Sequence, residues 1–250
     1  FHDLTKPMNK NMINKLSDID YLINCSGYVD HLDFENNGKN IFYNHFESVY
    51  TLSNLAIEIG VKSFIHLGSS DEYGKNKSPL KESIRESPES PYALGKLSST
   101  HYLQQCFRKG KLNTVILRPF LLFGEGQSKN RFLPYLIDNC IKDRKFKVSK
   151  GEQIRDFLYV SDFVDAIFLA LKKKNVEGEI LNIGYGKGYK VKEVIDNILK
   201  LFPNKKTISI SLSKDNKKEL KILYPNINKA KRYLNWQPKI SLIEGLKRLI

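Results

Sequence analysis

Two tyrosines in this chain are followed four positions later by a lysine. One pair is Tyr92 and Lys96 in SPYALGKLSS, and the other is Tyr73 and Lys77 in YGKNKSP. A phenol with a pKa of about 10 is a poor base at neutral pH, and a nearby ammonium group favours its ionised form. A Tyr and a Lys held side by side could therefore exchange a proton with a substrate hydroxyl. The chemistry requires a fixed geometry between the two side chains.

The segment around Tyr73 predicts no such geometry. Gly74, Asn76 and Pro79 are turn-forming residues, and they lie in or directly after this pair. We therefore expect Tyr73 and Lys77 to lie in a loop.

The segment around Tyr92 predicts a helix. Ser90 is a capping residue, and Pro91 stands at the position that proline favours in the first helical turn. Residues four apart share one face of a helix, so Tyr92 and Lys96 should point the same way. Only this pair can act as a unit.

Short apolar runs alternate with helical stretches along the chain. Expected strands cover 20–27, 61–70, 113–124 and 178–186, expected helices cover 36–60, 92–108, 131–143, 190–202 and 241–250, and 155–173 should be a strand followed by a helix. This alternation predicts an α/β fold, a Rossmann-like doubly wound parallel sheet with a smaller substrate-binding lobe. Ligands of such sheets bind beyond the carboxyl ends of the strands.

Small and polar residues gather at those strand ends. They are Cys25-Ser26-Gly27, Gly68-Ser69-Ser70 and Arg118-Pro119-Phe120. A site next to Tyr92 is therefore expected at this edge of the sheet.

Composition narrows the class of protein. The formal net charge is +14, but it comes mostly from scattered Lys, and no nucleic-acid-binding motif accompanies it, so no nucleic-acid partner is expected. No apolar run could span a bilayer and no signal pattern opens the chain, so a cytoplasmic protein without a membrane partner is expected. Three distant cysteines and five unclustered histidines predict no metal site, and we interpret each histidine as structural or exposed.

Eight segments, in order along the chain, resemble one family. They are DLT, DYLINCSG, FIHLGSSDEYG, SPYALGK, LRPFLLFG, RDFLYVSDFVDAI, LNIGYG and NKAKRYLNWQP. Together they resemble the extended short-chain dehydrogenase/reductases, in the NAD-dependent epimerase/dehydratase branch that acts on nucleotide sugars. The resemblance implies NAD or NADP as cofactor and a nucleotide sugar as substrate.

The resemblance also implies roles for individual residues. Tyr92 would be the base, Lys96 would contact the nicotinamide ribose, and Ser69, with Ser70 as the alternative, would hold the reacting oxygen. Other implied cofactor contacts are Asp3 and Leu4 at adenine, Cys25 and Ser26 at the dinucleotide, Asn44, and Pro119 and Phe120 beside the nicotinamide. The implied substrate contacts are Ser69, Ser70, Asp71 and Arg155, with Arg155 on the diphosphate. A salt bridge from Arg155 to Asp156 or Asp162 is the alternative.

Two departures from the family pattern stand out. The glycine-rich GxxGxxG fingerprint is absent, and the chain starts at the Asp3-Leu4 element. We expect the first two strand-helix units to be missing, in a fragment or a truncated homologue, and this piece alone to bind NAD(P) poorly. Leu121 stands where many of these enzymes have an Asn at the substrate diphosphate.

The reaction type depends on residues 70–72. Dehydratases of this branch have Asp-Glu where this chain has Ser70-Asp71, and on a strand Glu72 would turn to the other face. An epimerase is therefore expected, with a reductase of 4-keto-6-deoxy sugar nucleotides as the alternative and a 4,6-dehydratase less favoured. A non-catalytic dinucleotide-binding homologue remains open outside the enzymes.

The same resemblance predicts the organisation of the molecule. The dinucleotide-binding core would comprise 1–121 and 152–184, and the substrate-binding lobe 122–151 and 185–250. A homodimer would form through the helices at 36–60 and 92–108.

Overall fold

A computed structural model of the chain describes residues 2–203, 210–212 and 220–250. Its main sheet contains β1 (Tyr21–Asn24), β2 (Ser63–Leu67), β3 (Thr114–Pro119) and β8 (Ile180–Ile183), in the order β1-β2-β3-β8. All three pairings are parallel. β2, β3 and β8 are buried along nearly their whole length, as expected for a parallel sheet covered on both faces.

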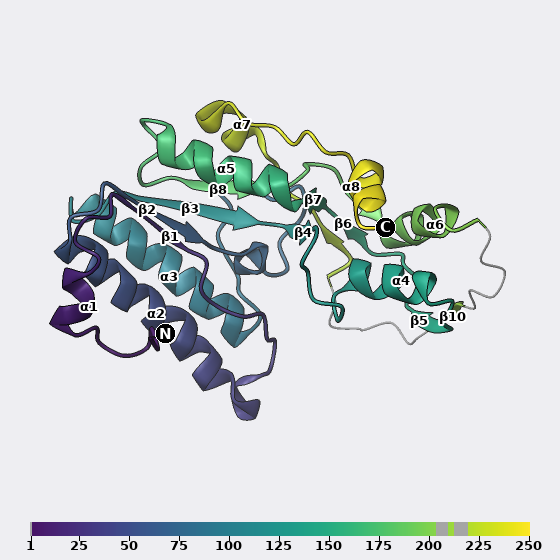
Figure 1. Ribbon diagram of the computed structural model, residues 1–250, viewed down its shortest axis with the longest axis horizontal. Coiled ribbons are helices and arrows are strands. Elements are labelled where there is room, and N and C mark those ends of the chain that lie inside the picture. The colour runs from purple at the N-terminus through teal and green to yellow at the C-terminus, as the bar shows by residue number, and fades with distance from the viewer. Residues whose placement is uncertain (1, 204–209, 213–219) are drawn as a thin grey trace.

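Helices cover both faces of this sheet (Figure 1). α2 (Gly38–Glu58) and α3 (Pro91–Arg108) pack together on one face, and α5 (Val160–Lys172) and α7 (Asn228–Leu234) lie on the other. The short α1 (Lys10–Asn14) precedes β1. Two apolar clusters, one on each face, make the core of this three-layer unit. The predicted Rossmann-like arrangement is thereby confirmed.

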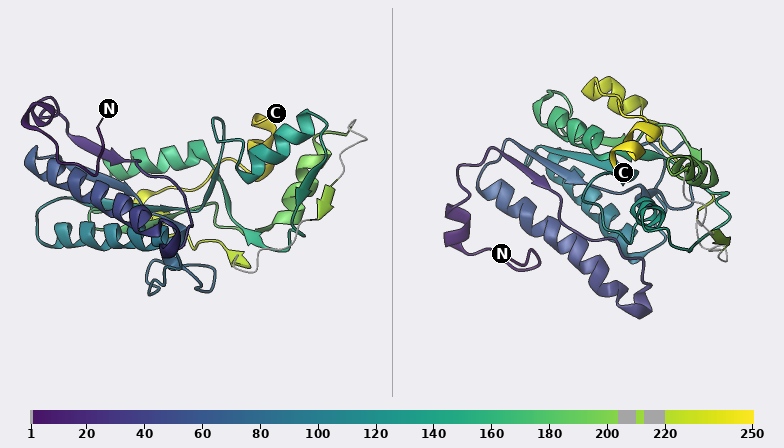
Figure 2. Two further views of the ribbon diagram at one scale, coloured as in Figure 1. Left: turned by 90° about the horizontal axis from the view of Figure 1, so that it is seen from below. Right: turned by 45° about the vertical axis from the view of Figure 1, so that its right-hand side comes forward.

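A smaller lobe lies beyond the carboxyl ends of the sheet strands, at the right of Figure 1 and the right of the left-hand view in Figure 2. It contains α4 (Phe132–Ile141), β5 (Phe146–Val148), α6 (Val191–Lys200), β10 (Ile210–Leu212) and α8 (Leu242–Arg248). Its apolar cluster joins α4, α6 and α8. Three more short strands, β6 (Ile154–Arg155), β9 (Tyr189–Lys190) and β11 (Ile222–Leu223), form a separate small sheet.

The expected strand over 113–124 is two strands. β3 ends at Pro119, and after Phe120 the chain forms β4 (Leu121–Phe123), which pairs in parallel with β7 (Phe157–Tyr159) instead of with the main sheet. The break exists because β3 is held between β2 and β8, while Phe123 packs into the lobe. Phe157 and Tyr159 also join the lobe cluster, so the two units share their boundary. The division into core and lobe at the expected residue numbers stays a prediction.

Within the described residues, no helix is long and apolar enough to cross a membrane. The same part of the chain contains no group of three His, Cys, Asp or Glu side chains suited to a metal ion.

Candidate active site

The helix that carries Tyr92 begins as its sequence predicts. Ser90 has an extended backbone, and its Oγ accepts a hydrogen bond of 3.1 Å from the Ala93 amide. Pro91 occupies the first turn of α3. Tyr92 and Lys96 follow one turn apart, and both are buried.

Tyr73 and Lys77 do not form a pair that could act together, and the reason differs in part from the expected one. Tyr73 ends a short 3-10 helix, η2 (Ser70–Tyr73), and its ring is fully buried. Its hydroxyl donates a hydrogen bond of 2.8 Å to Oδ1 of Asn182. Lys77 is exposed, whereas Tyr73 is buried, so the two side chains lie in different surroundings. The expected loop is confirmed at Lys77 and is wrong at Tyr73, which belongs to η2.

The surroundings of Tyr92 and Lys96 do not favour the ionised phenol that the sequence led us to expect. The Lys96 ammonium donates a hydrogen bond of 2.8 Å to the Leu67 carbonyl, and burial lowers the Lys96 pKa to about 8. Burial raises the pKa of Tyr92 to about 12, and a hydrogen bond with the Ser69 side chain acts in the opposite direction. In this arrangement the phenol therefore stays protonated, because desolvation disfavours its charged form.

Ser69 stands at the start of η2 and contacts Tyr92. Its Oγ accepts a hydrogen bond of 3.1 Å from the Asp71 amide, and its own amide donates to Oε1 of Glu72 at 2.7 Å. The bond from the Ser69 amide to Glu72 is one half of a capping box, in which the Ser69 side chain also accepts from the Glu72 backbone. Because Ser69 also bonds with Tyr92, its hydroxyl couples the strand end to the helix.

Glu72 turns away from the site, as expected, but the reason is not the alternation of a strand. Residues 70–73 form η2, which directs Glu72 into the interior, where its carboxylate pairs with Arg118 at 2.6 Å. Asp71 remains at the cavity.

Ser69 and Ser70 can be told apart by substitution. Ser69→Ala removes the partner of Tyr92 and one helix cap, so we expect turnover to fall about 100-fold and unfolding free energy to fall by about 1 kcal/mol. Ser70→Ala should change turnover less than about threefold, because this substitution removes no hydrogen bond to Tyr92. Steady-state kinetics and urea unfolding of both variants measure this, and equal effects would reject the assignment to Ser69.

Two cavities meet at Tyr92. The larger, of about 550 Å³, lies between the sheet and the lobe, and the smaller, of about 160 Å³, lies beside β1. Residues that line the larger cavity include Ser69, Ser70, Asp71, Pro119, Phe120, Leu121, Arg131 and Arg155. Residues that line the smaller cavity include Cys25, Ser26, Gly27, Leu67 and Lys96. Tyr92, Val29 and Gly68 line both.

The smaller cavity has the features of a ribose or dinucleotide site. Gly27 has φ +126°, and a Cβ there would lie 2.8 Å from Cε1 of His45. The position therefore requires glycine, and its backbone is bare because no side chain covers it. Lys96 places its ammonium beside this bare backbone. A hydrogen-bonding cation next to a close backbone approach fits the implied nicotinamide ribose.

His45 is a site residue that sequence reasoning missed. Asn44, the expected residue on α2, donates a hydrogen bond of 3.3 Å to the Tyr28 hydroxyl. His45 instead lies against Tyr92, with ring centroids 4.9 Å apart. Burial and the Lys96 charge lower the pKa of His45 to about 4, so the ring is neutral.

Asp3 and Leu4 lie elsewhere. The Asp3 carboxylate accepts hydrogen bonds from the Thr5 amide and hydroxyl, at 2.9 and 2.8 Å. Leu4 packs against the apolar cluster between α2, α3 and the sheet. Neither residue lines the two cavities, and their contact with adenine stays a prediction.

Arg155 lies in β6, is buried, and lines the larger cavity. Asp156 and Asp162, the alternative salt-bridge partners of Arg155, both accept hydrogen bonds from backbone amides. Asp156 receives the amides of Tyr185, Gly186 and Lys187 at 2.6 to 3.2 Å, and Asp162 receives those of Lys239 and Ile240 at 3.0 and 2.9 Å. Asp156 thus holds the backbone beside Arg155 in place.

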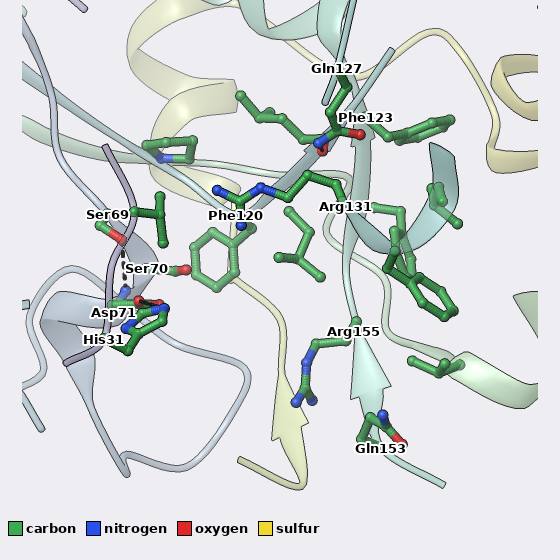
Figure 3. Close-up of a pocket in the computed structure, with 18 of the residues that line it drawn as sticks. His31, Ser69, Ser70, Asp71, Phe120, Phe123, Gln127, Arg131, Gln153 and Arg155 are labelled. Atoms are coloured by element: carbon green, nitrogen blue, oxygen red, sulfur yellow. Dashed lines mark hydrogen bonds and ion pairs between the residues drawn. The ribbon is translucent and has the colours of Figure 1, made fainter. Parts of the chain in front are cut away.

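Arg131 adds a second guanidinium to the larger cavity. It stands at the start of α4, and its charge partly opposes the burial that raises the pKa values of Asp71 and Tyr92. Figure 3 shows Arg131 and Arg155 reaching the cavity from the lobe side, with Gln127 and Gln153 nearby. Sequence reasoning missed Arg131, Gln127 and Gln153, because they come from segments without a recognisable motif. The only available signal was an Arg at the start of the helix expected at 131–143.

Comparison with known proteins decides the family. The sequence model of the NAD dependent epimerase/dehydratase family matches residues 1–184. The chain belongs to this family. The resemblance found in the sequence is thereby confirmed.

Relatives in this family carry out different reactions. A dTDP-D-glucose 4,6-dehydratase of Mus musculus is 29% identical over 83% of this chain and 60% of its own length. A dTDP-4-dehydro-6-deoxyglucose reductase of Escherichia coli is 29% identical over 88% of this chain and 70% of its own. The chain thus spans about 60% of the length of the dehydratase it matches.

A solved structure supports the same fold. UDP-glucuronic acid 4-epimerase of Bacillus cereus, in complex with UDP-glucuronic acid and NAD, superimposes with a TM-score of 0.88 at 27% identity. The match covers 99% of this chain and 78% of the epimerase chain. The family's fold is therefore present over essentially the whole chain.

Proposed function

We propose that the whole protein is an NAD(P)-dependent epimerase of a nucleotide-activated sugar, with Tyr92 as the group that exchanges a proton with a ring hydroxyl. The observation that carries this proposal is the position of Tyr92 at the junction of the two cavities. A proton carrier placed there can touch a substrate in one cavity and a cofactor in the other. The alternative is a reductase of a 4-keto-6-deoxy sugar nucleotide, since the site chemistry is shared.

The smaller cavity would hold the nicotinamide end of the cofactor. Lys96 would contact the ribose, and the backbone of Cys25, Ser26 and Gly27 would approach the dinucleotide. Pro119 and Phe120, which line the other cavity, would lie at the nicotinamide. When bound, NAD(P) supplies the acceptor or donor of the hydride.

The residues around Tyr92 move and hold the proton. Tyr92 donates or accepts it at the sugar oxygen, and Ser69 hydrogen-bonds the same oxygen and so fixes its distance. A cation bound next to Tyr92 would lower its pKa from about 12, because an opposite charge favours the phenolate. The Lys96 ammonium could approach from its present bond to Leu67.

Two arginines support a nucleotide sugar as substrate. Arg131 and Arg155 line the same cavity, and guanidinium groups bind diphosphate oxygens with paired hydrogen bonds. Leu121 lines this cavity as well and offers no hydrogen bond, so the arginines would carry the diphosphate contact.

The test is conversion of UDP-glucuronic acid, UDP-glucose and dTDP-glucose by the whole protein with NAD or NADP. We expect one of them to give a product inverted at one ring carbon, detected by liquid chromatography and NMR. Reduction of dTDP-4-dehydro-6-deoxyglucose with NADPH would favour the reductase. Cofactor binding with no conversion of any of these compounds would favour a non-catalytic homologue.

We also propose a homodimer through α2 and α3. α2 leaves two aromatic side chains uncovered, with Tyr43 47% and Tyr50 42% exposed. Tyr50 and Phe46 contact Tyr102 of α3 with ring centroids 5.5 and 5.9 Å apart. An exposed aromatic patch of this kind favours association with the same patch on a second copy of the chain.

Substitution of Tyr50 tests this dimer. The Tyr50→Glu variant should sediment as a monomer, because a carboxylate in the patch would lose its water on association. Phe168→Glu, on the exposed face of α5, is the matched control and should leave the dimer intact. A monomeric parent protein in sedimentation velocity would reject the proposal.

A further inference from the structure

His45 is a buried side chain at the place where α2, α3 and the chain after β1 meet (Figure 1). Its ring lies edge-on to the Tyr92 ring, with centroids 4.9 Å apart. Its backbone carbonyl accepts a hydrogen bond of 3.1 Å from the Ser99 hydroxyl of α3. On its other side, Cε1 of the ring lies 2.8 Å from the position that a Cβ on Gly27 would take. His45 therefore packs between the Tyr92 helix and the backbone of the smaller cavity.

The contacts of the His45 ring determine which of its nitrogens carries the hydrogen. Burial and the Lys96 charge lower the pKa of the ring, and a hydrogen bond with the Tyr28 backbone raises it. A bond that raises the pKa of an imidazole favours its protonated form, so the ring donates and the Tyr28 carbonyl accepts. Nε2 is buried and has no hydrogen-bond partner among the residues that the structure describes, so Nδ1 is the donor. Nε2 of the neutral ring is thus a bare acceptor.

His66, on β2, has its hydrogen on the opposite nitrogen. Oδ1 of Asn24 accepts from the Ser26 amide and hydroxyl at 2.9 and 2.6 Å, so the Asn24 amide group faces His66 and donates to Nδ1 at 3.2 Å. Burial lowers the pKa of this ring well below its usual value, so it is neutral as well. With Nδ1 as the acceptor, Nε2 carries the hydrogen. His66 therefore has no acceptor nitrogen to offer to a neighbouring cation.

The Lys96 ammonium lies beside the His45 ring. Nζ is 3.7 Å from the position of a Cβ on Gly27, and Cε1 of His45, which is bonded to Nε2, approaches the same position. One ammonium hydrogen goes to the Leu67 carbonyl at 2.8 Å, and an ammonium group has three. Rotation about the last bonds of the Lys96 side chain can therefore bring an ammonium hydrogen to Nε2.

Groups from four elements act on the Lys96 charge. Burial lowers the Lys96 pKa to about 8, while Glu72 of η2 and Cys25 after β1 raise it. The Lys96 charge in turn lowers the pKa values of His45 on α2 and His66 on β2. A protonated imidazole would repel the ammonium, whereas a neutral ring with a bare nitrogen stabilises it. Of the two imidazoles, only His45 has that nitrogen available.

We propose that His45 is a positioning residue for Lys96: its bare Nε2 accepts a hydrogen bond from the ammonium when Lys96 turns away from Leu67, and thereby keeps Lys96 charged beside Tyr92. His45 acts on the reaction only through Lys96. This effect on turnover rests on the proposed function, in which a cation next to Tyr92 favours the ionised phenol.

The hydrogen positions are tested in the parent protein without any substitution. NMR of the whole protein labelled with ¹⁵N-histidine distinguishes a ring nitrogen that carries hydrogen from a bare one. We expect hydrogen on Nδ1 of His45 and on Nε2 of His66 at neutral pH. Hydrogen on Nε2 of His45 would overturn the inference, because the acceptor would not exist.

The His45→Phe variant removes the acceptor and keeps a ring against Tyr92. The Lys96 pKa, measured in the cofactor-free whole protein by pH titration of the lysine NMR signals, should fall by about one pH unit, because loss of a hydrogen bond disfavours the charged form. The His45→Gln variant keeps an acceptor oxygen and should retain the parent value. An equal fall in both variants, or in neither, would contradict the role of Nε2.

His66→Phe is the matched control. His66 is also buried and also feels the Lys96 charge, but its bare nitrogen is already occupied by Asn24. Its replacement should leave the Lys96 pKa unchanged. Equal shifts for His45→Phe and His66→Phe would overturn the inference, and circular dichroism checks that the variants fold.

The pH profile of turnover separates this role from a merely structural one. In His45→Phe the alkaline limb should move about one pH unit lower, because Lys96 then loses its charge at a lower pH. An unmoved limb in a folded variant would reject the positioning role. If the whole protein converts none of the sugar nucleotides, the proposed function fails, while the histidine hydrogens and the Lys96 pKa still decide this inference.

Discussion

Turnover of the whole protein on the proposed nucleotide-sugar substrate should fall about 1000-fold when Tyr92 is replaced by Phe. The substitution removes one oxygen, which bonds with Ser69 and which the proposed function makes the atom that exchanges the proton. Loss of a general acid–base group costs roughly 10² to 10⁴ in rate. The apparent affinity for substrate should change little, because the ring and its contacts with His31 and His45 remain. Steady-state kinetics measures both quantities.

Tyr233→Phe is the control for this change. Tyr233 lies in α7, on the opposite face of the sheet from α3, and it packs against the core. It should leave turnover within about twofold of the parent. If Tyr92→Phe kept more than about a tenth of the parent turnover while folding normally, Tyr92 would not be the proton carrier.

Free energy of unfolding should fall by about 3–5 kcal/mol when Glu72 is replaced by Gln. Glu72 and Arg118 are both fully buried, and the carboxylate accepts from Nε and Nη2 of Arg118 at 2.9 and 2.6 Å and from Thr100 at 2.9 Å. The neutral amide would leave the buried guanidinium largely uncompensated, with only the partly exposed Glu86 at 2.8 Å. Urea unfolding followed by circular dichroism measures the loss.

Glu89→Gln is the matched control, since its partner Lys75 is an exposed side chain. Exposed ion pairs contribute about 0 to 1 kcal/mol, so this variant should lose no more than that. A double replacement of Glu72 and Arg118 by Met should lose less than the sum of the two single replacements, because neither member of this buried pair is left without the other. Equal losses for Glu72→Gln and Glu89→Gln would contradict the role of burial.

Glu72 also links stability to the site. Its Oε1 accepts the Ser69 amide, so the same side chain that balances Arg118 fixes the start of η2. We therefore regard Glu72 as a positioning residue whose effect on turnover would pass through Ser69.

Local patterns in the sequence were sufficient for the elements that carry the chemistry. Ser90 and Pro91 determine where α3 begins, and the spacing of Tyr92 and Lys96 then places both on one face. Alternating apolar runs and helices determined the parallel sheet, since each of these signals lies within a few neighbouring residues. The position of Ser26 and Ser69, just after β1 and β2, followed from that sheet.

Only the tertiary structure decided which further residues meet Tyr92. His31 and His45 come from outside the predicted motifs, and Arg131 comes from the lobe, so no spacing along the chain relates them to α3. The strand break at Phe120 and the inward turn of Glu72 depend on pairing with β7 and Arg118, which are distant in sequence. Burial also reversed the expected effect on Tyr92, because desolvation raises its pKa while Lys96 bonds to a carbonyl. Contacts and desolvation of this kind arise only when the chain has folded.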